Sequence, residues 1–358
     1  MQIGDEIIAG VSINNVTGIT GKSYELHDLL RAGREAEAMG FDAVWVHDGM
    51  MGRRTTAAFD PPAVLTAVAA QTKRIRLCTG ILIPHLRNPI HLAQTWATLN
   101  EVSEGRPILC AGAGGGRGTI HKRQYGALTA IRRGADFDPD LFYKRRARHF
   151  AECVGVLRRL WSEDKFSHHG EFYDFDDITL GYARPAEPPP LVVAAGMYIP
   201  KEEKGAHFPI WDENTRGKFI VGKHSSQAMI DHSVGWLTNH CHPEEVGSHY
   251  KRMMEIAEKT YPGRKYAIGL NCFMNIDDDN RKAWEGVRSH LEDFHGPPIP
   301  DDLVDRWGCW GTGEEVAERI NSYIDVGVTL FQFVVANSDQ FGMMKRIAED
   351  VLPRLKRV

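Results

Sequence analysis

The sequence lacks a marked excess of charge of either sign. Its 43 lysines and arginines stand against 47 aspartates and glutamates, which leaves a formal net charge of −4. Proteins that bind nucleic acid usually carry a basic surface that neutralises phosphates. The charge balance therefore argues against a nucleic-acid partner.

Long apolar runs are also missing, and cysteines are few. No run approaches the roughly 18 residues that a membrane-spanning helix needs, and MQIGDEIIAGVSINN has no secretory-signal character. The six cysteines contain no Cys-x-x-Cys pair, and Cys78, Cys110 and Cys272 lie within apolar runs. Such cysteines are typical of buried thiols in a reducing compartment. We expect a cytoplasmic protein that does not contact a membrane.

What the sequence does have is a regular alternation of short apolar runs with longer amphipathic stretches. The runs are nearly continuous in apolar residues, as parallel strands buried on both faces are. They lie at 3–13, 42–47, 74–83, 107–112, 191–195, 234–238, 266–274 and 329–335. Helices are expected between them, at 24–39, 61–72, 89–103, 142–160, 244–259 and 314–326. Asp60 and Asn88 each precede a proline, which predicts a polar cap at a helix start.

Eight strands separated by helices predict an α/β fold, the (β/α)8 or TIM barrel, with residues 1–358 as a single domain. An open, doubly wound sheet is the alternative, because the assignment rests on the number of strands. Two segments break the alternation. Residues 165–190 have the pattern of a hairpin and an extended connector, and 197–223 form a polar insertion after the fifth strand. In a barrel we expect both over the C-terminal face, where active sites lie.

Segments spread over nearly the whole chain resemble the luciferase-like family of flavin- and F420-dependent oxidoreductases. They include AEAMGFDAVWVHD, RIRLCTGILIPHLRNP, RPILCAGAG, PPPLVVAAG and GTGEEVAERINSYIDVGVTLFQF, in the family's order. The resemblance implies a luciferase-like barrel and an oxidoreductase that uses coenzyme F420 or FMN. With F420, a hydride would pass to or from a small organic substrate. With reduced FMN and O2, the enzyme would be a monooxygenase with a flavin reductase as partner. The family resemblance also implies a homodimer.

The same resemblance implies a cofactor site at the ends of strands two to five. Related deazaflavin enzymes carry a non-prolyl cis peptide near the position of Gly80, which supports the cofactor ring; a plain glycine turn is the alternative. The glycine-rich turn after strand four allows a ligand to approach the backbone closely, but it lacks the spacing of a Rossmann fingerprint. The expected cofactor-binding residues are Asp48, Thr79, Gly80, Ile81, Ile83, Gly112, Ala113, Gly114, Gly115, Ala195 and Gly196.

Three residues are candidates for catalysis. His47 and Asp48 end strand two, a position where barrels place catalytic groups. Asp48 matches a family aspartate near the cofactor, and His47 titrates near neutrality and could act as acid or base. His240 follows strand six in the segment Asn239-His240-Cys241-His242. Neighbouring ligands on one loop seldom enclose a zinc ion, so no metal is expected.

Further residues are weaker candidates for binding. Lys201, Lys204 and Arg216 could hold a cofactor phosphate, although interspersed acidic residues favour a solvated charged surface. Phe331 and Gln332 end strand eight and could line the pocket, with apolar core as the alternative for Phe331.

Two departures from the family pattern bear on the substrate. In sugar-phosphate dehydrogenases of the deazaflavin branch, a histidine follows the strand-two aspartate and a glutamate follows the strand-four turn. Here these positions hold Gly49 and Gly115, so the sugar-phosphate reaction is not predicted. Two other functions are alternatives: a metal-dependent barrel hydrolase, which would gather histidines at several strand ends, and a cofactor-binding relative without turnover.

Overall fold

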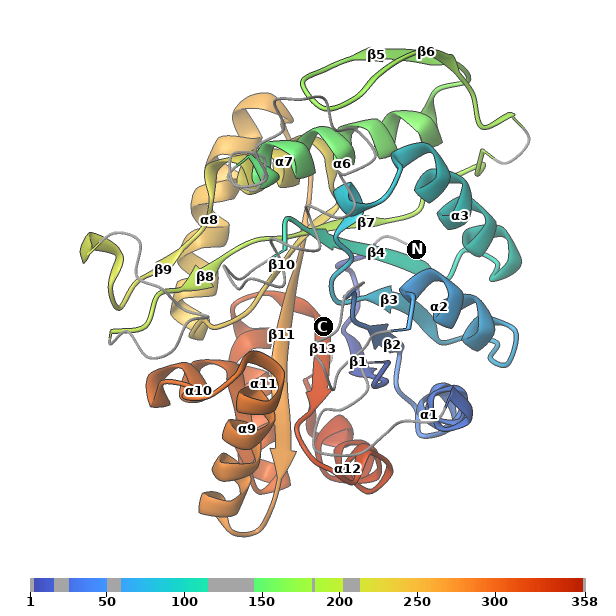
Figure 1. Ribbon diagram of the computed structural model, residues 1–358. Helices are drawn as coiled ribbons and strands as arrows, with labels where there is room; N and C mark the ends of the chain where they lie inside the picture. The colour runs from blue at the N-terminus through green and yellow to red at the C-terminus, as the bar shows by residue number, and fades with distance from the viewer. Residues whose placement is uncertain are drawn as a thin grey trace.

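The centre of the computed structural model is a closed barrel of parallel strands (Figure 1). The structure describes residues 3–15, 26–49, 59–114, 145–181, 184–201 and 213–356. Consecutive barrel strands pair with one another, and β13 pairs with β1 to close the ring. The strands are β1 (Ile8–Ser12), β2 (Ala43–Val46), β3 (Arg76–Thr79), β4 (Pro107–Gly112), β7 (Leu191–Ala194), β10 (Gly235–Thr238), β11 (Ala267–Ile276) and β13 (Val328–Val335). The predicted (β/α)8 barrel is confirmed, and the open sheet is excluded.

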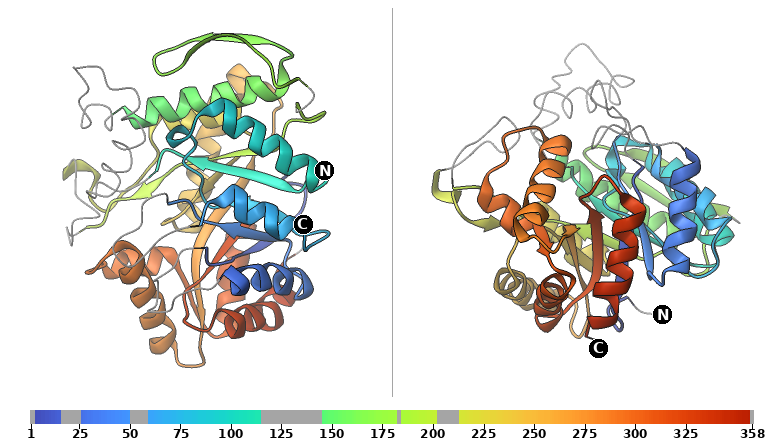
Figure 2. Two further views of the ribbon diagram at one scale, coloured as in Figure 1. Left: turned by 45° about the vertical axis from the view of Figure 1, so that its right-hand side comes forward. Right: turned by 90° about the horizontal axis from the view of Figure 1, so that it is seen from below.

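Helices surround the barrel in all views (Figure 2). They are α1 (Leu26–Ala38), α2 (Pro61–Ala69), α3 (Pro89–Val102), α6 (Arg146–Ser162), α7 (Lys223–His232), α8 (Pro243–Thr260), α9 (Asn280–His295), α10 (Asp301–Trp307), α11 (Gly313–Asp325) and α12 (Gln340–Arg346). The side chain of Asn88 caps α3, because it accepts hydrogen bonds from the amides of Ile90 and His91. Asp60 does not cap α2, since its carboxylate bonds to Arg87 instead.

One strand of the sheet was not expected. β12 (Gly308–Gly311) pairs with the last residues of β11, beyond the part of β11 that pairs with β10. Its sequence, GCWG, contains two glycines and no apolar run. The usual strand signal is therefore absent, and only the pairing with β11 holds it extended.

The core has two layers, one inside the barrel and one between the barrel and its helices. The inner layer includes Trp45, Cys78, Ile108 and Cys110, and all six cysteines are buried and unpaired.

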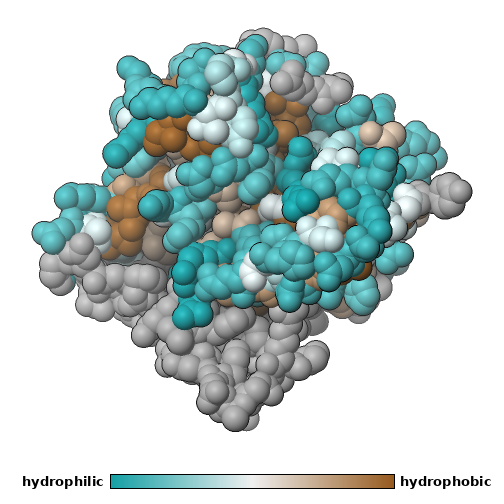
Figure 3. Space-filling model, turned by 90° about the horizontal axis from the view of Figure 1, so that it is seen from above, coloured by the Kyte–Doolittle hydropathy of each residue, from teal (hydrophilic) through white to brown (hydrophobic). Residues whose placement is uncertain are grey.

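Among the described residues, no helix combines the length and the apolar composition needed to cross a membrane. On the face drawn in Figure 3, the coloured surface is mainly hydrophilic with small separate apolar patches.

The hairpin expected in 165–190 exists as β5 (Phe166–His169) and β6 (Asp174–Ile178). The expectation that it covers the C-terminal face is wrong, because it lies along the outer side of α6 (Figure 1). The carboxylate of Glu152 accepts hydrogen bonds from the amides of Phe172 and Tyr173 and thereby fastens the hairpin to that helix. In the second insertion, β8 (Met197–Tyr198) and β9 (Phe219–Ile220) form a short antiparallel pair directly after β7.

Candidate active site

The carboxylate of Asp48 follows β2 and holds together the segment after β3. Its oxygens accept hydrogen bonds from Nη1 and Nη2 of Arg87, at 2.7 and 2.9 Å, and from the amide of Ile83 at 2.8 Å. The side chain of Asp48 is 1% exposed. Through these three hydrogen bonds Asp48 positions the main chain at Ile83 and the side chain of Arg87.

The peptide bond between Gly80 and Ile81 is cis, as the family resemblance implied. Strand pairing resumes after it, because the amide of Leu82 donates to the Cys110 carbonyl at 2.8 Å. A Cβ atom on Gly80 would lie 2.2 Å from the amide group of the Gln332 side chain, so the glycine leaves room for that side chain. Gln332 is fully buried, and its Nε2 donates to the Gly80 carbonyl at 3.3 Å and to Oγ of Ser12 at 3.1 Å. Gln332 thus supports the bulge from inside the barrel instead of lining the pocket.

The side chain of Ile81 lies at the ends of β4 and β7. A Cβ atom on Gly112 would lie 2.5 Å from Cδ1 of Ile81 and 3.3 Å from Cβ of Ala194, so the glycine lets Ile81 pack against the β4 backbone. Ile81 and Ala194 are partly exposed. We call the surface formed by Ile81, Gly112 and Ala194 the Ile81 platform. It is apolar and carries no long side chain.

Not every expected cofactor residue lies on the platform. Thr79 is fully buried, and its hydroxyl donates to the Cys110 carbonyl at 2.9 Å and accepts from the Cys110 amide at 3.1 Å. Its role is to join β3 to β4. Ile83 is also buried and packs beside Gly114. Gly115 lies outside the residues that the structure describes.

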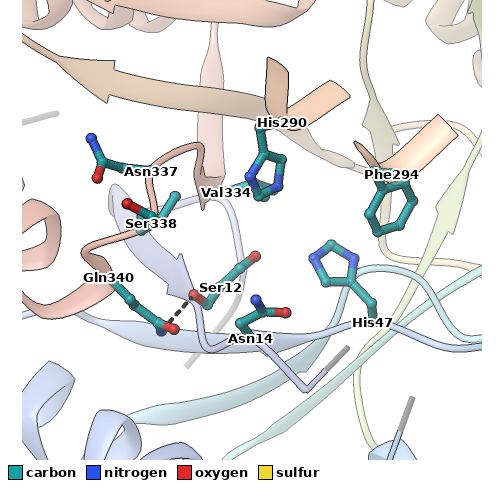
Figure 4. Close-up of a pocket in the computed structure, with 10 residues that line it drawn as sticks. Ser12, Asn14, His47, His290, Phe294, Val334, Asn337, Ser338 and Gln340 are labelled. Carbon is teal, nitrogen blue, oxygen red and sulfur yellow. Dashed lines mark hydrogen bonds between the residues drawn. The ribbon is translucent and has the colours of Figure 1, made fainter. Parts of the chain in front are cut away.

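A pocket opens beside the bulge, between the ends of β1, β2 and β13 and the helix α9 (Figure 4). It is lined by Ser12, Asn14, His47, His290, Phe294, Val334, Val335, Asn337, Ser338 and Gln340. Among the described residues that line it, none carries a permanent charge. Phe331, by contrast, is fully buried in the outer core layer.

His47 forms one wall of this pocket, and its backbone is firmly held. Oδ1 of Asn15 accepts from the His47 amide, and Nδ2 of Asn15 donates to the His47 carbonyl, both at 2.7 Å. Burial lowers the pKa of His47 to about 4, although a backbone hydrogen bond with Gly80 acts in the opposite direction. The imidazole is therefore neutral at physiological pH and stands next to the bulge.

The second imidazole in the pocket belongs to His290, which the sequence analysis did not single out. His290 projects from α9 and is 4% exposed, and its ring points into the same space as that of His47 (Figure 4). Burial, reinforced by the proximity of His47, lowers the pKa of His290 to about 3. A signal was present in the sequence: His290 lies on the buried face of α9 with Ala283, Val287 and Leu291. A histidine at an apolar position of a helix has no chemical motif around it and is usually part of the core.

His240 is not part of this pocket. It has a φ angle of 54° and is 5% exposed, and its ring packs edge-on against Trp307 with 3.7 Å between ring centroids. Burial lowers the pKa of His240 to about 3. The structure brings His47 together with His290, and not with His240. Within the described chain, no group of three or more His, Cys, Asp or Glu side chains is arranged to hold a metal ion.

Two of the three basic residues that the sequence suggested for a cofactor phosphate, Lys201 and Arg216, are in contact. Nη1 of Arg216 donates to the Lys201 carbonyl at 3.2 Å, so these two residues are joined through the backbone. Lys204 lies outside the described residues.

Comparison with known proteins identifies the family. The model described as luciferase-like monooxygenase matches residues 9–202, and the chain belongs to that family. An F420-dependent glucose-6-phosphate dehydrogenase of Amycolatopsis mediterranei is 27% identical and covers 94% of this chain and 97% of that protein. One of Intrasporangium calvum, with the same name, is 28% identical over 90% of this chain and 92% of that protein.

Solved structures share the fold over almost the full length. An F420-dependent secondary alcohol dehydrogenase, in complex with an F420–acetone adduct, superposes with a TM-score of 0.74 at 20% identity, covering 99% of this chain and all of that one. The oxygenating constituent of 3,6-diketocamphane monooxygenase from Pseudomonas putida, in complex with FMN, has a TM-score of 0.68 at 15% identity, covering 98% of this chain and 99% of that one.

Proposed function

We propose that this protein is an F420-dependent oxidoreductase that moves a hydride between the cofactor and an uncharged alcohol or carbonyl compound. One observation carries the proposal. The neutral imidazole of His47 lies next to the Gly80–Ile81 bulge and lines a pocket. The described residues that line this pocket are uncharged. The names of the two curated relatives support F420 over FMN.

The Ile81 platform fits the cofactor's flat ring. Ile81 would contact one face of the ring, and the main chain of Gly112, Ala113 and Ala195 would lie at its edges, because none of these residues has a long side chain to displace it. When bound, F420 supplies the hydride acceptor or donor, and the protein supplies binding, orientation and proton handling. Asp48 and Arg87 contribute indirectly, since their ion pair fixes the main chain at Ile83.

His47 is the proton acceptor in this scheme. In the direction of oxidation, the substrate carbon loses its hydride while the hydroxyl proton passes to His47, which leaves a carbonyl compound. A neutral imidazole is the form that can accept a proton, and burial keeps His47 neutral. In the reverse direction the same ring returns the proton to the carbonyl oxygen.

The substrate is proposed to differ from that of the two relatives. A sugar phosphate needs basic side chains that bind its phosphate. No lysine or arginine lines the pocket within the described residues, and Gly49 stands where sugar-phosphate dehydrogenases have histidine. We therefore propose neutral alcohols and ketones. The homodimer and the cytoplasmic location implied above are separate proposals, of which light scattering tests the first.

The test is a paired fluorescence titration of the purified protein with F420 and with FMN, in oxidised and reduced forms, followed by an anaerobic screen of secondary alcohols. Tight binding of F420 and alcohol-dependent loss of its absorbance would support the proposal. Preference for reduced FMN, with oxygen-dependent turnover in the presence of a flavin reductase, would overturn it in favour of a monooxygenase. Tight binding without turnover of either kind would indicate a non-catalytic relative.

A further inference from the structure

The imidazole of His290 contains a buried polar atom without a partner. Its Nδ1 is shielded from solvent and has no hydrogen-bond partner in the part of the chain that the structure describes, and the residue as a whole is 4% exposed. Polar side chains in a protein interior are nearly always hydrogen-bonded, and an exception needs an explanation. The ring lines the pocket and points into it (Figure 4), so we expect the imidazole to bind a ligand there.

His290 and His47 approach the pocket from opposite sides. His47 comes from the end of β2 and bonds to Gly80, the first residue of the bulge. His290 comes from α9, where its ring lies against Phe273 at 5.4 Å between centroids. A substrate whose reacting carbon lies near the bulge therefore meets His47 at that carbon and His290 at a more distant atom. The two imidazoles have different tasks.

The chemistry around His290 limits what that distant atom can be. The other polar side chains among the described lining residues are uncharged amides and hydroxyls, those of Asn14, Asn337, Gln340, Ser12 and Ser338. A carboxylate or phosphate would be desolvated here with no cation among the described lining residues to balance it. A hydroxyl or carbonyl oxygen, in contrast, can exchange a hydrogen bond with a neutral imidazole in either tautomer.

We propose that His290 is a specificity residue that hydrogen-bonds to a second, uncharged oxygen of the substrate. The preferred substrates are then small neutral molecules with oxygens on neighbouring carbons, such as vicinal diols and hydroxyketones, ahead of simple alcohols. The oxidation of the diol rests on the proposed function, whereas the binding of the diol to His290 does not. A site built to hydrogen-bond a hydroxyl discriminates strongly against an analogue that lacks it, because the buried group is then left unpaired.

The kinetic test compares butane-2,3-diol with butan-2-ol, which lacks the second hydroxyl. We expect the F420-loaded enzyme to show a kcat/KM at least about tenfold higher for the diol, as for one hydrogen bond in a buried site. In His290→Phe this preference disappears, because kcat/KM falls more for the diol than for butan-2-ol. His290→Asn, which restores a neutral donor and acceptor, recovers part of the preference. Phe294→Leu is the matched control, since it changes the same wall of the pocket without removing a polar atom and keeps the preference.

A second readout does not depend on turnover. In cofactor-free protein with isotope-labelled histidine, the NMR signal that is absent from His290→Phe identifies His290. Butane-2,3-diol should shift this signal in a saturable way, at concentrations where butan-2-ol does not. If the shift occurs and no alcohol is oxidised, the proposed reaction fails and the His290 site stands. Three results would each overturn the specificity role of His290. They are equal NMR shifts by both alcohols, no shift by either alcohol, and an equal loss of kcat/KM for both substrates in His290→Phe.

Discussion

Asp48 and Arg87 form a two-pronged ion pair, with Nη1 to Oδ2 at 2.7 Å and Nη2 to Oδ1 at 2.9 Å, between the end of β2 and the segment after β3. Asp48 is 1% and Arg87 12% exposed at the side chain. The pair is therefore shielded from water, and it joins the end of β2 to the segment between the cis peptide and α3.

Removal of Arg87 is expected to destabilise the protein strongly. Arg87→Ala leaves the Asp48 carboxylate buried with the Ile83 amide as its remaining donor, and breaking one side of a buried pair costs about 3 kcal/mol of unfolding free energy. Urea unfolding followed by circular dichroism measures this loss. Arg281→Ala is the control, because Arg281 pairs with Glu285 on the exposed surface of α9 and should cost less than about 0.5 kcal/mol. Equal losses of unfolding free energy in the two variants would show that the buried pair stabilises the fold no more than the exposed pair does.

A methyl group at Gly112 should weaken cofactor binding while leaving the fold intact. The added Cβ would lie 2.5 Å from Cδ1 of Ile81, which is the movable tip of a side chain. Ile81 can shift at small cost, but it then leaves its place on the platform that is proposed to hold the ring. We expect Gly112→Ala to raise the dissociation constant for F420 about tenfold, equivalent to about 1.4 kcal/mol.

Gly222→Ala provides the matched control for that titration. A Cβ atom on Gly222 meets no atom within 4 Å, and its φ angle of −70° suits any residue. F420 fluorescence should give the same dissociation constant for Gly222→Ala as for the unchanged protein. If Gly112→Ala also binds F420 normally, the ring does not lie on the Ile81 platform.

The two histidines chosen from the sequence should differ sharply when replaced. His47→Gln is expected to lower kcat for the oxidation of an alcohol by about 100-fold to 10,000-fold, the usual contribution of a general base. F420 binding should change by less than about threefold, because the proposed role of His47 is toward the substrate. His240→Gln should keep kcat within about threefold, since His240 packs against Trp307 away from the pocket. The measurement is kcat of both variants from steady-state kinetics at saturating F420. If His240→Gln lowers kcat and His47→Gln does not, His240 would be the proton acceptor.

The barrel could be predicted because its signals are local. Buried parallel strands and capped amphipathic helices each leave a pattern in consecutive residues, so all eight barrel strands and the expected helices are present. β12 was missed because its four residues have no strand pattern of their own. The hairpin was recognised, but its position depends on contacts with α6, and distant contacts leave no local pattern.

The site was harder to predict because it depends on which strand ends meet. Asp48 was found, but the sequence does not show that Arg87 lies opposite it. His240 and His290 illustrate the same difficulty. The motif-like Asn239–His242 segment attracted attention, whereas His290 sits inside an ordinary amphipathic helix and becomes a candidate only when α9 is placed beside β2.

Histidines whose pKa is lowered in the fold should also make stability depend on pH. Burial lowers the pKa of His47 to about 4 and those of His240 and His290 to about 3, whereas an unfolded histidine titrates near pH 6.5. Between these values the unfolded chain binds more protons than the folded one, so the free energy of unfolding falls as the pH drops from about 6.5 toward 4. The slope is at most about 1.4 kcal/mol per pH unit for each histidine. Carboxylates whose pKa is lowered in the fold, such as Glu245, contribute only at the acidic end of this window.

Replacement of one buried histidine should make this dependence shallower. In His290→Phe, urea unfolding between pH 5 and pH 7 should give a slope that is smaller by about 1 kcal/mol per pH unit, because one proton fewer is taken up on unfolding. Phe294→Leu changes the same wall of the pocket without removing a titratable group and should leave the slope unchanged. If His290→Phe and the unchanged protein have the same slope, His290 does not stay neutral in the folded protein. A charged His290 would in turn favour an anionic oxygen on the substrate, so the pH series tests the assumption of a neutral imidazole independently of any turnover.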